Sequence, residues 1–169
     1  MLDKNILNKV LDEALKKGGD FAEIYIEDKS TSNIFYDDNK IESINSGREK
    51  GAGIRVIKQG KTSYVHTNDL SAKGLLKAAA AAGRGAGPHA IFRPSIALHR
   101  NELNLEEELL SEQLSLADKI QSITDANEAA RNYSREIRQV TITLGDVAQA
   151  IQIANSDGEL IEDERSRVR

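Results

Sequence analysis

The stretch Gly51-Ala-Gly-Ile-Arg-Val-Ile-Lys-Gln-Gly-Lys-Thr-Ser-Tyr-Val-His-Thr67 predicts two β-strands joined by a tight turn. Alternate residues of the first arm are apolar and would share one face, namely Ala52, Ile54 and Val56. This period of two is typical of a half-buried strand. Gly60 supplies the positive φ that a short hairpin loop requires, at little steric cost. We therefore expect a β-hairpin over residues 52–67 and place the rest of the chain around it.

The segment upstream of the hairpin predicts one helix followed by a strand. Residues 3–17 carry apolar side chains at helical spacing, namely Ile6, Leu7, Val10, Leu11, Ala14 and Leu15. Asp3 can cap the start of this helix, and Gly18-Gly19 can form the left-handed turn that ends it. Residues 21–27 then alternate as a strand does, and the strand is expected to resume at residues 34–36 after a polar Ser/Thr stretch.

Glycines complicate the strand that leads into the hairpin. Ile41 and Ile44 are three residues apart, which is out of step with a plain strand and suggests a bulge. Gly47, Gly51 and Gly53 indicate either further bulges or places where another backbone approaches closely. After the hairpin, a helix is expected from Asp69 or Ser71 to Ala82, and its predicted buried face consists of Leu75, Leu76, Ala79 and Ala80.

The second half of the chain repeats this order of elements. Residues 88–114 contain both prolines and show no period, so we expect an irregular connection there. Ser115 and Asp118 form a capping-box pattern at the start of a helix over residues 115–132. Its apolar positions are Leu116, Ile120, Ile123, Ala126 and Ala130. Two strands follow, over residues 136–144 and 147–154, with a turn at Gly145-Asp146 between them, and the turn Asn155–Gly158 leads into a third strand.

These patterns predict an α+β protein with helices packed on a mainly antiparallel sheet. The elements form either two helix-plus-antiparallel-sheet units or one sheet built from both. The corresponding divisions are residues 1–87, the connection 88–114, and residues 115–169. The final strand has no terminating signal, which suggests a piece of a longer polypeptide whose sequence continues; a frayed charged tail would give the same pattern.

Composition excludes several classes of function. The net charge is −4 and the chain has no cysteine, so there is no electrostatic basis for a nucleic-acid partner and no disulfide or thiolate metal site. No apolar run approaches the roughly 20 residues that span a bilayer. A cytoplasmic protein without nucleic-acid or membrane partners is therefore expected.

Residues with catalytic or metal-binding potential do not form a recognisable site. The three histidines, His66, His89 and His99, lack metal-ligand spacing. The carboxylate pair Asp37-Asp38 is better explained as a turn, and the glycine run 83–87 follows a helix, whereas a phosphate-binding loop precedes one. We therefore predict no catalytic or metal-ligating residue in this chain.

The order and spacing of several segments resemble the TldD/PmbA (TldD/TldE) family, in particular the N-terminal domain of its TldD branch. These segments are Gly19–Ile26, Lys40–Glu42, Gly51–Ile57, Gly60–Val65 and Ile153–Gly158. The resemblance implies a zinc metallopeptidase that acts on peptides and small unfolded proteins as a homodimer or a TldD–TldE-type heterodimer. Older naming calls the family modulators of DNA gyrase.

The family's zinc ligands and catalytic glutamate belong to a His-Glu-x-x-x-His motif with a distant cysteine, in a later domain. This chain contains neither the motif nor a cysteine, so no zinc is expected in it and it should be inactive alone. The resemblance suggests a non-catalytic part that helps to enclose the peptidase chamber and to join the partner subunit. The alternative is a stand-alone binding or regulatory module of the gyrase-modulator type.

An extended peptide can pair with a sheet edge through its backbone, independently of its sequence. The hairpins at residues 52–67 and 147–165 are the predicted edges. The candidate contact residues for peptide or partner subunit are Gly53, Ile54, Arg55 and Tyr64.

Overall fold

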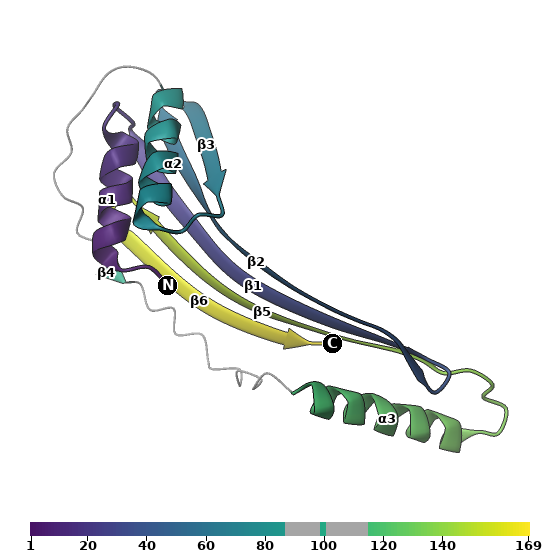
Figure 1. Ribbon diagram of the computed structural model, residues 1–169. Coiled ribbons are helices and arrows are strands. Elements are labelled where there is room, and N and C mark those ends of the chain that lie inside the picture. The colour runs from purple at the N-terminus through teal and green to yellow at the C-terminus, as the bar shows by residue number, and fades with distance from the viewer. Residues whose placement is uncertain (87–98, 101–114) are drawn as a thin grey trace. The chain divides into compact units, whose positions relative to one another are not determined.

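The computed structural model describes residues 1–86, 99–100 and 115–169. The elements are α1 (Lys4–Leu15), β1 (Phe21–Asp37), β2 (Lys40–Lys58), β3 (Lys61–Thr67), α2 (Ala72–Gly85), β4 (His99–Arg100), α3 (Leu116–Tyr133), β5 (Thr141–Asn155) and β6 (Glu159–Val168) (Figure 1). The six strands form one sheet in the order β3-β2-β1-β5-β6-β4. Five strands are antiparallel, and the two-residue β4 pairs in parallel with β6. This arrangement confirms the α+β fold class.

The predicted hairpin is present with the expected arms. β2 and β3 pair in antiparallel register from Ala52 opposite Thr67 to Lys58 opposite Lys61. The turn residues Gln59 and Gly60 have φ of 48° and 76°. The left-handed conformation predicted for Gly60 is therefore confirmed.

The first two strands are longer than their sequence pattern indicates. β1 runs without a break through the polar stretch between Glu27 and Ile34, and β2 runs through Gly47, Gly51 and Gly53. The prediction of separate strands over residues 136–144 and 147–154 was wrong: they form one strand, β5, which begins at Thr141, and Gly145 exchanges backbone hydrogen bonds with Arg169. Backbone hydrogen bonds to neighbouring strands can hold such segments extended despite weak local preference. Of the predicted irregular connection at 88–114, only His99 and Arg100 are described, and they form β4; the other residues lie outside the described part of the chain.

Two compact units can be distinguished along the chain, and each has its own apolar core. Unit 1 comprises Met1–Asp28, Glu49–Asn104 and Ala150–Glu164, and unit 2 comprises Lys29–Arg48, Leu105–Gln149 and Arg165–Arg169. The core of unit 1 is formed by α1, α2 and the strand residues that face them. The core of unit 2 is much smaller: its buried residues are Ile34, Tyr36 and Ile123, with Ile41, Ile142 and Leu144 packed against them.

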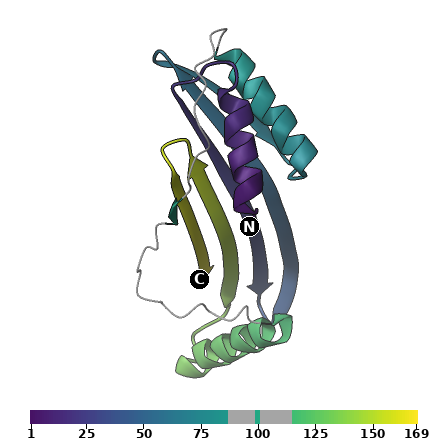
Figure 2. The same cartoon turned by 90° about the vertical axis from the view of Figure 1, so that its left-hand side faces the viewer.

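In unit 1, α1 and α2 lie side by side over the sheet (Figures 1 and 2). A Cβ added to Gly83 of α2 would lie 2.5 Å from the carbonyl oxygen of Ala14 in α1, so the two helices can approach this closely only with glycine there. The predicted buried face of α2 was partly wrong. Leu76 and Ala80 are only half-buried, and the face in contact includes the small residues Gly74, Ala78, Ala82 and Gly83.

The predicted helix starts are confirmed by their hydrogen bonds. The Asp3 carboxylate accepts from the backbone N–H of Asn5, and the Ser71 hydroxyl accepts from that of Gly74. Ser115 and Asp118 form the expected capping box at the start of α3. Among the described residues, no helix combines the length and apolar character needed to cross a bilayer.

Candidate functional site

The four candidate contact residues lie on paired positions of β2 and β3 in unit 1. Arg55 is directly opposite Tyr64, and Ile54 is opposite Val65. Directly paired residues of an antiparallel ladder point to the same face, and successive residues point to opposite faces. Arg55 and Tyr64 therefore share one face, whereas Ile54 is fully buried in the core on the other. Only three of the four candidates are thus available on a common surface.

Gly53 provides space for the ring of Tyr64. A Cβ added to Gly53 would lie 2.1 Å from the phenolic oxygen of Tyr64 and 2.7 Å from Cζ. The tyrosine side chain therefore lies against the bare backbone of β2, while 61% of the residue remains exposed. The sequence indicated a close approach at Gly53, and the approaching group is this aromatic side chain rather than another backbone.

Arg55 is held across β1 by two neighbours. Its Nη2 lies 3.0 Å from Oε1 of Glu23, and its guanidinium carbon lies 5.9 Å from the centroid of the Phe21 ring. The Arg55 Nε is buried and has no hydrogen-bond partner among the described residues. Arginine and tyrosine are enriched in protein–protein interfaces, so an exposed Arg55–Tyr64 pair has the composition of a contact surface.

The strand order identifies which predicted edge is available for backbone pairing. β3 lies at one end of the sheet, and no further strand of the described residues lies beyond it. β5, by contrast, lies between β1 and β6, so the first arm of the predicted hairpin at 147–165 is not an edge. The register also shows a segment that the sequence did not predict as a possible edge. The β2–β3 ladder begins at Ala52, so residues 40–51 of β2 are not paired with β3. An edge strand of this kind can accept an extended peptide.

No residue set in the described part of the chain fits a zinc ion. Structural and catalytic zinc sites require at least three converging His, Cys, Asp or Glu ligands. No such group occurs among residues 1–86, 99–100 and 115–169. His66 is exposed on β3, and His89 lies outside the described residues. We therefore assign no metal-dependent step to these residues.

Two carboxylates of the described residues, Asp69 and Asp37, have a lowered pKa, and each has a structural partner. Hydrogen bonds from the hydroxyl and backbone N–H of Ser71 lower the pKa of Asp69 at the start of α2. Hydrogen bonds from Gln139 and Thr141 lower the pKa of Asp37. These hydrogen bonds stabilise the charged carboxylates and so lower their pKa, whereas a general acid or base needs a pKa near the working pH. They are therefore explained by local structure.

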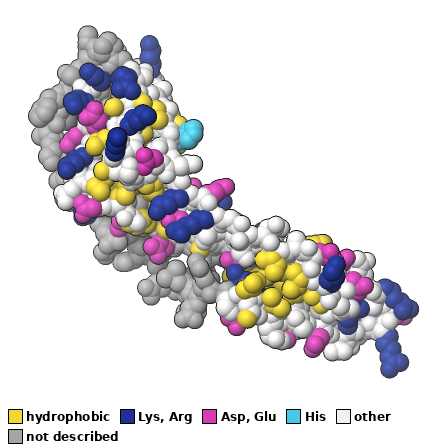
Figure 3. Space-filling view, viewed as in Figure 1, with side chains coloured by type: hydrophobic (Ala, Val, Ile, Leu, Met, Phe, Trp, Pro, Cys, Tyr) yellow, Lys and Arg dark blue, Asp and Glu magenta, His cyan; other side chains and the backbone are white. Residues whose placement is uncertain are grey.

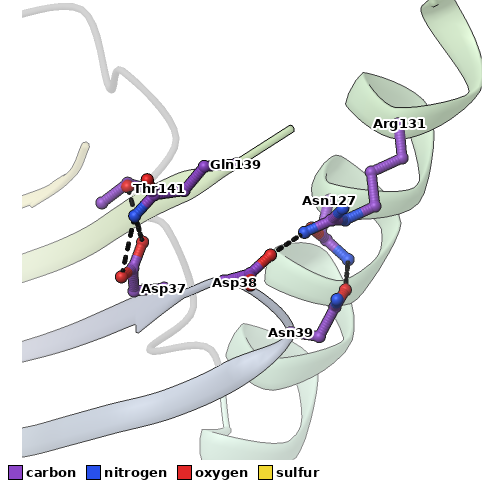
Figure 4. A network of polar contacts seen from close by, with 7 residues as sticks. All are labelled: Asp37, Asp38, Asn39, Asn127, Arg131, Gln139 and Thr141. Atoms are coloured by element: carbon purple, nitrogen blue, oxygen red, sulfur yellow. Dashed lines mark hydrogen bonds and ion pairs between the residues drawn. The ribbon is translucent and has the colours of Figure 1, made fainter. Parts of the chain in front are cut away.

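Asp37 belongs to a polar network at the β1–β2 turn in unit 2 (Figure 4). Asp37 accepts from Gln139 Nε2 at 2.9 Å and from Thr141 Oγ1 at 2.8 Å. The next two residues, Asp38 and Asn39, have positive φ of 41° and 70° and contact α3. The prediction that Asp37-Asp38 is a turn rather than a catalytic pair is consistent with this geometry.

Charge is mixed over the described surface. Figure 3 shows Lys and Arg side chains interspersed with Asp and Glu on the visible face, with no large field of one sign among the described residues there. Proteins that bind nucleic acid present a basic patch or stripe. The described residues on the visible face form no such patch.

Comparison with known protein families identifies the family to which this chain belongs. A model described as PmbA/TldA metallopeptidase domain 1 matches residues 22–86, and one described as the PmbA/TldA metallopeptidase central domain matches residues 110–169. The chain belongs to the PmbA/TldD metallopeptidase family. The two matches cover most of its length and follow the same order as the predicted halves.

The curated relatives that this chain matches are longer proteins. A metalloprotease of Methanothermobacter thermautotrophicus is 26% identical over 171 residues, covering 99% of this chain and 36% of the relative. A metalloprotease of Synechocystis is 26% identical over 145 residues, covering 85% of this chain and 31% of the relative. The chain thus spans about a third of the length of the relatives that it matches.

Solved structures share the fold. TldE from Thermococcus kodakarensis superposes with a TM-score of 0.70 at 15% identity, covering 96% of this chain and 37% of that chain. A candidate modulator of a DNA gyrase from Thermotoga maritima superposes with a TM-score of 0.75 at 17% identity, covering 98% of this chain and 38% of that chain. At these identities the likeness shows a common fold.

Proposed function

We propose that this chain is a non-catalytic N-terminal and central part of a TldD-like zinc metallopeptidase. The proposal rests on two observations taken together. The matched families are the first and central domains of a metallopeptidase, and no described residue set fits the family's zinc. The whole sequence also lacks a His-Glu-x-x-x-His motif and any cysteine, so in this proposal the bond-cutting residues and the zinc ligands are supplied by a region outside these 169 residues.

In this proposal the sheet binds the peptide substrate and the partner subunit. β3 offers a backbone edge, and Arg55 and Tyr64 offer exposed side chains beside it. Backbone pairing at an edge holds an extended chain without reading its sequence, which suits a peptidase acting on peptides and small unfolded proteins. The same surface suits docking of a second subunit, in a homodimer or a TldD–TldE-type heterodimer in the cytoplasm.

The proposal is tested first on the chain as it stands. Purified protein is analysed for metal content by mass spectrometry and incubated with an unstructured peptide, with and without a chelator. We expect far less than one zinc per chain and no chelator-sensitive cleavage. Stoichiometric zinc together with chelator-sensitive cleavage would contradict the proposal, because it would place the catalytic site within these residues.

The edge assignment has its own test. A labelled unstructured peptide is titrated against wild-type protein and against His66→Pro, which removes a backbone N–H of β3 at a position paired with Gly53, where the N–H points away from β2. Thr31→Pro in β1 is a control for general strand damage, since β1 lies between β2 and β5. Weakened binding in the folded His66→Pro variant, with binding preserved in any folded Thr31→Pro variant, supports β3 as the edge. Equal affinity of wild type and His66→Pro contradicts it.

A regulatory module of the gyrase-modulator type is the second candidate, favoured by the similarity in fold to the candidate modulator of a DNA gyrase from Thermotoga maritima. The mixed charge and the net charge of −4 favour a protein partner for such a module over direct contact with DNA. Reading the coding sequence downstream of the Arg169 codon separates the candidates. An open frame with a His-Glu-x-x-x-His motif supports the peptidase, and a native stop codon supports the module.

A further inference from the structure

Helix α3 is attached to unit 2 mainly by polar side chains. Its buried residues are Lys119, Ile123 and Asn127, so a single apolar side chain enters the core. α1, by comparison, buries five apolar side chains, namely Leu7, Val10, Leu11, Ala14 and Leu15. Apolar burial is the main source of helix docking free energy in globular proteins. α3 therefore depends unusually strongly on its polar contacts.

These polar contacts lie on one row of the helix. Lys119, Ile123, Asn127 and Arg131 follow one another at intervals of four residues, which places them along the same helix face. The apolar positions expected for this helix are only partly buried: Ile123 is buried, whereas Leu116 and Ala126 are exposed. The reason is that the opposing surface supplies carboxylates and an amide, which select polar residues on α3.

One end of the row is held by a largely buried ion pair. Lys119 Nζ lies 2.6 Å from Oδ1 of Asp146 in β5, and the two side chains are only 10% and 18% exposed. Removing one partner of such a pair leaves a charge in a poorly solvated position, which is strongly unfavourable. Dissolved salt screens buried charges much less than exposed ones.

The other end is held by the β1–β2 turn (Figure 4). Asn39 Oδ1 accepts a hydrogen bond from Asn127 Nδ2 at 2.8 Å, and the guanidinium of Arg131 pairs with the Asp38 carboxylate. Asp38 is 58% exposed and Arg131 is 28% exposed, so solvent and salt reach this pair. The two ends of α3 thus differ in their sensitivity to ionic strength.

We propose that α3 can detach from the strands of unit 2 while these strands remain paired with one another. We call this detachment the opening of α3. Opening breaks the contacts of the row and uncovers the apolar strand residues beneath it, namely Ile34, Tyr36, Ile41, Ile142 and Leu144. Salt promotes opening by weakening the Asp38–Arg131 pair. Unit 2 therefore contains a covered apolar surface whose exposure is controlled by ionic contacts, independently of the proposed peptidase role.

Hydrogen exchange of the intact chain tests whether α3 detaches, without any substitution. Backbone amide exchange is measured at 50 mM and 500 mM NaCl, with α1 as the internal reference. We expect exchange of α3 amides to increase several-fold at high salt relative to α1, while the amides of β1 around Ile34 remain unchanged. Equal exchange rates in α3 and this part of β1 at both salt concentrations would overturn the proposal, because α3 would then open only together with the sheet.

Paired variants identify the contact responsible. Asp38→Asn keeps a residue that tolerates positive φ but removes the charge, and it should raise α3 exchange about threefold and abolish most of its salt dependence. Asp146→Asn should raise exchange about tenfold or more and retain the salt dependence. Glu42→Gln is the matched control, because Glu42 belongs to an exposed ion pair on the same hairpin whose partner, Lys40, is not an α3 residue. The proposal is rejected if Asp38→Asn and Glu42→Gln give the same exchange.

Discussion

The Gln152 side chain binds both backbone groups of Leu2, a residue 150 positions away. The backbone N–H of Leu2 donates to Gln152 Oε1 at 2.8 Å, and Gln152 Nε2 donates to the Leu2 carbonyl at 3.0 Å. Gln152 is fully buried, and its Nε2 also donates to Glu162 at 2.7 Å. One amide thus connects the start of α1 to β5 and β6 within unit 1.

Gln152→Leu should destabilise the protein by about 2–3 kcal/mol, because it leaves the Leu2 N–H and carbonyl without this partner in a poorly solvated place. Chemical denaturation measures the loss. Gln121→Leu is the control, since Gln121 is exposed on α3 and bonds only locally to Asp125. Equal stability of the Gln152→Leu variant and wild type would show that the contact contributes nothing.

Gly60→Val and Gly158→Val should each cost about 1–3 kcal/mol, because both glycines have positive φ, of 76° and 96°. A Cβ at Gly60 would meet no atom within 4 Å, so the cost there comes from the backbone alone. Gly60→Asn should therefore recover part of the loss. Thermal melts provide the measurement, and Gly47→Ala, where a Cβ has room, should be nearly neutral.

Gly53→Ala should displace the Tyr64 ring, because the new Cβ would overlap the phenol. In a Tyr64→Ala background the same substitution should lose that conflict. A double-mutant cycle is expected to give a coupling of about 0.5 kcal/mol or more. Additive effects would show that the ring does not lie against Gly53 in solution.

The lowered pKa of Asp37 predicts a specific acid sensitivity. A carboxylate with a depressed folded-state pKa contributes stability above its ordinary value of 3.8, and this contribution is lost as the pH falls through the folded-state pKa. The contribution of Asp37 should thus be complete above about pH 5 and be lost below about pH 4. Gln139→Leu removes the main hydrogen-bond donor and should raise the Asp37 pKa, which NMR titration measures directly. An unchanged pKa in this variant would contradict the assignment.

Local sequence signals were sufficient for much of the fold. The alternation around Ile54 predicted the β2–β3 hairpin, and Gly60 predicted its turn. Asp3 and Ser115 predicted helix starts that the hydrogen bonds confirm. Each of these features depends on residues close together in the chain, so periodicity and capping chemistry are enough to identify them.

The candidate site was only partly predictable. Arg55 and Tyr64 were predicted as contacts and do share a face, whereas Ile54 belongs to the core. The reason that Gly53 is glycine became apparent only from the ring of Tyr64 on the neighbouring strand. A pairing register is needed to see this, and the sequence does not state which residues of two strands lie opposite one another.

By itself the sequence determined the order of the three helices, the β2–β3 hairpin, the α+β class and the family, because local periodicity, turn chemistry and the spacing of segments depend on residues close together in the chain. It divided β5 wrongly into two strands at Gly145-Asp146. Only the tertiary structure decided which face of α3 is buried and that Gln152 holds Leu2. These outcomes depend on which carboxylates, amides and backbone groups the fold brings together from distant positions. A polar residue is buried where such a partner satisfies it, and that partner is specified by the packing of the chain.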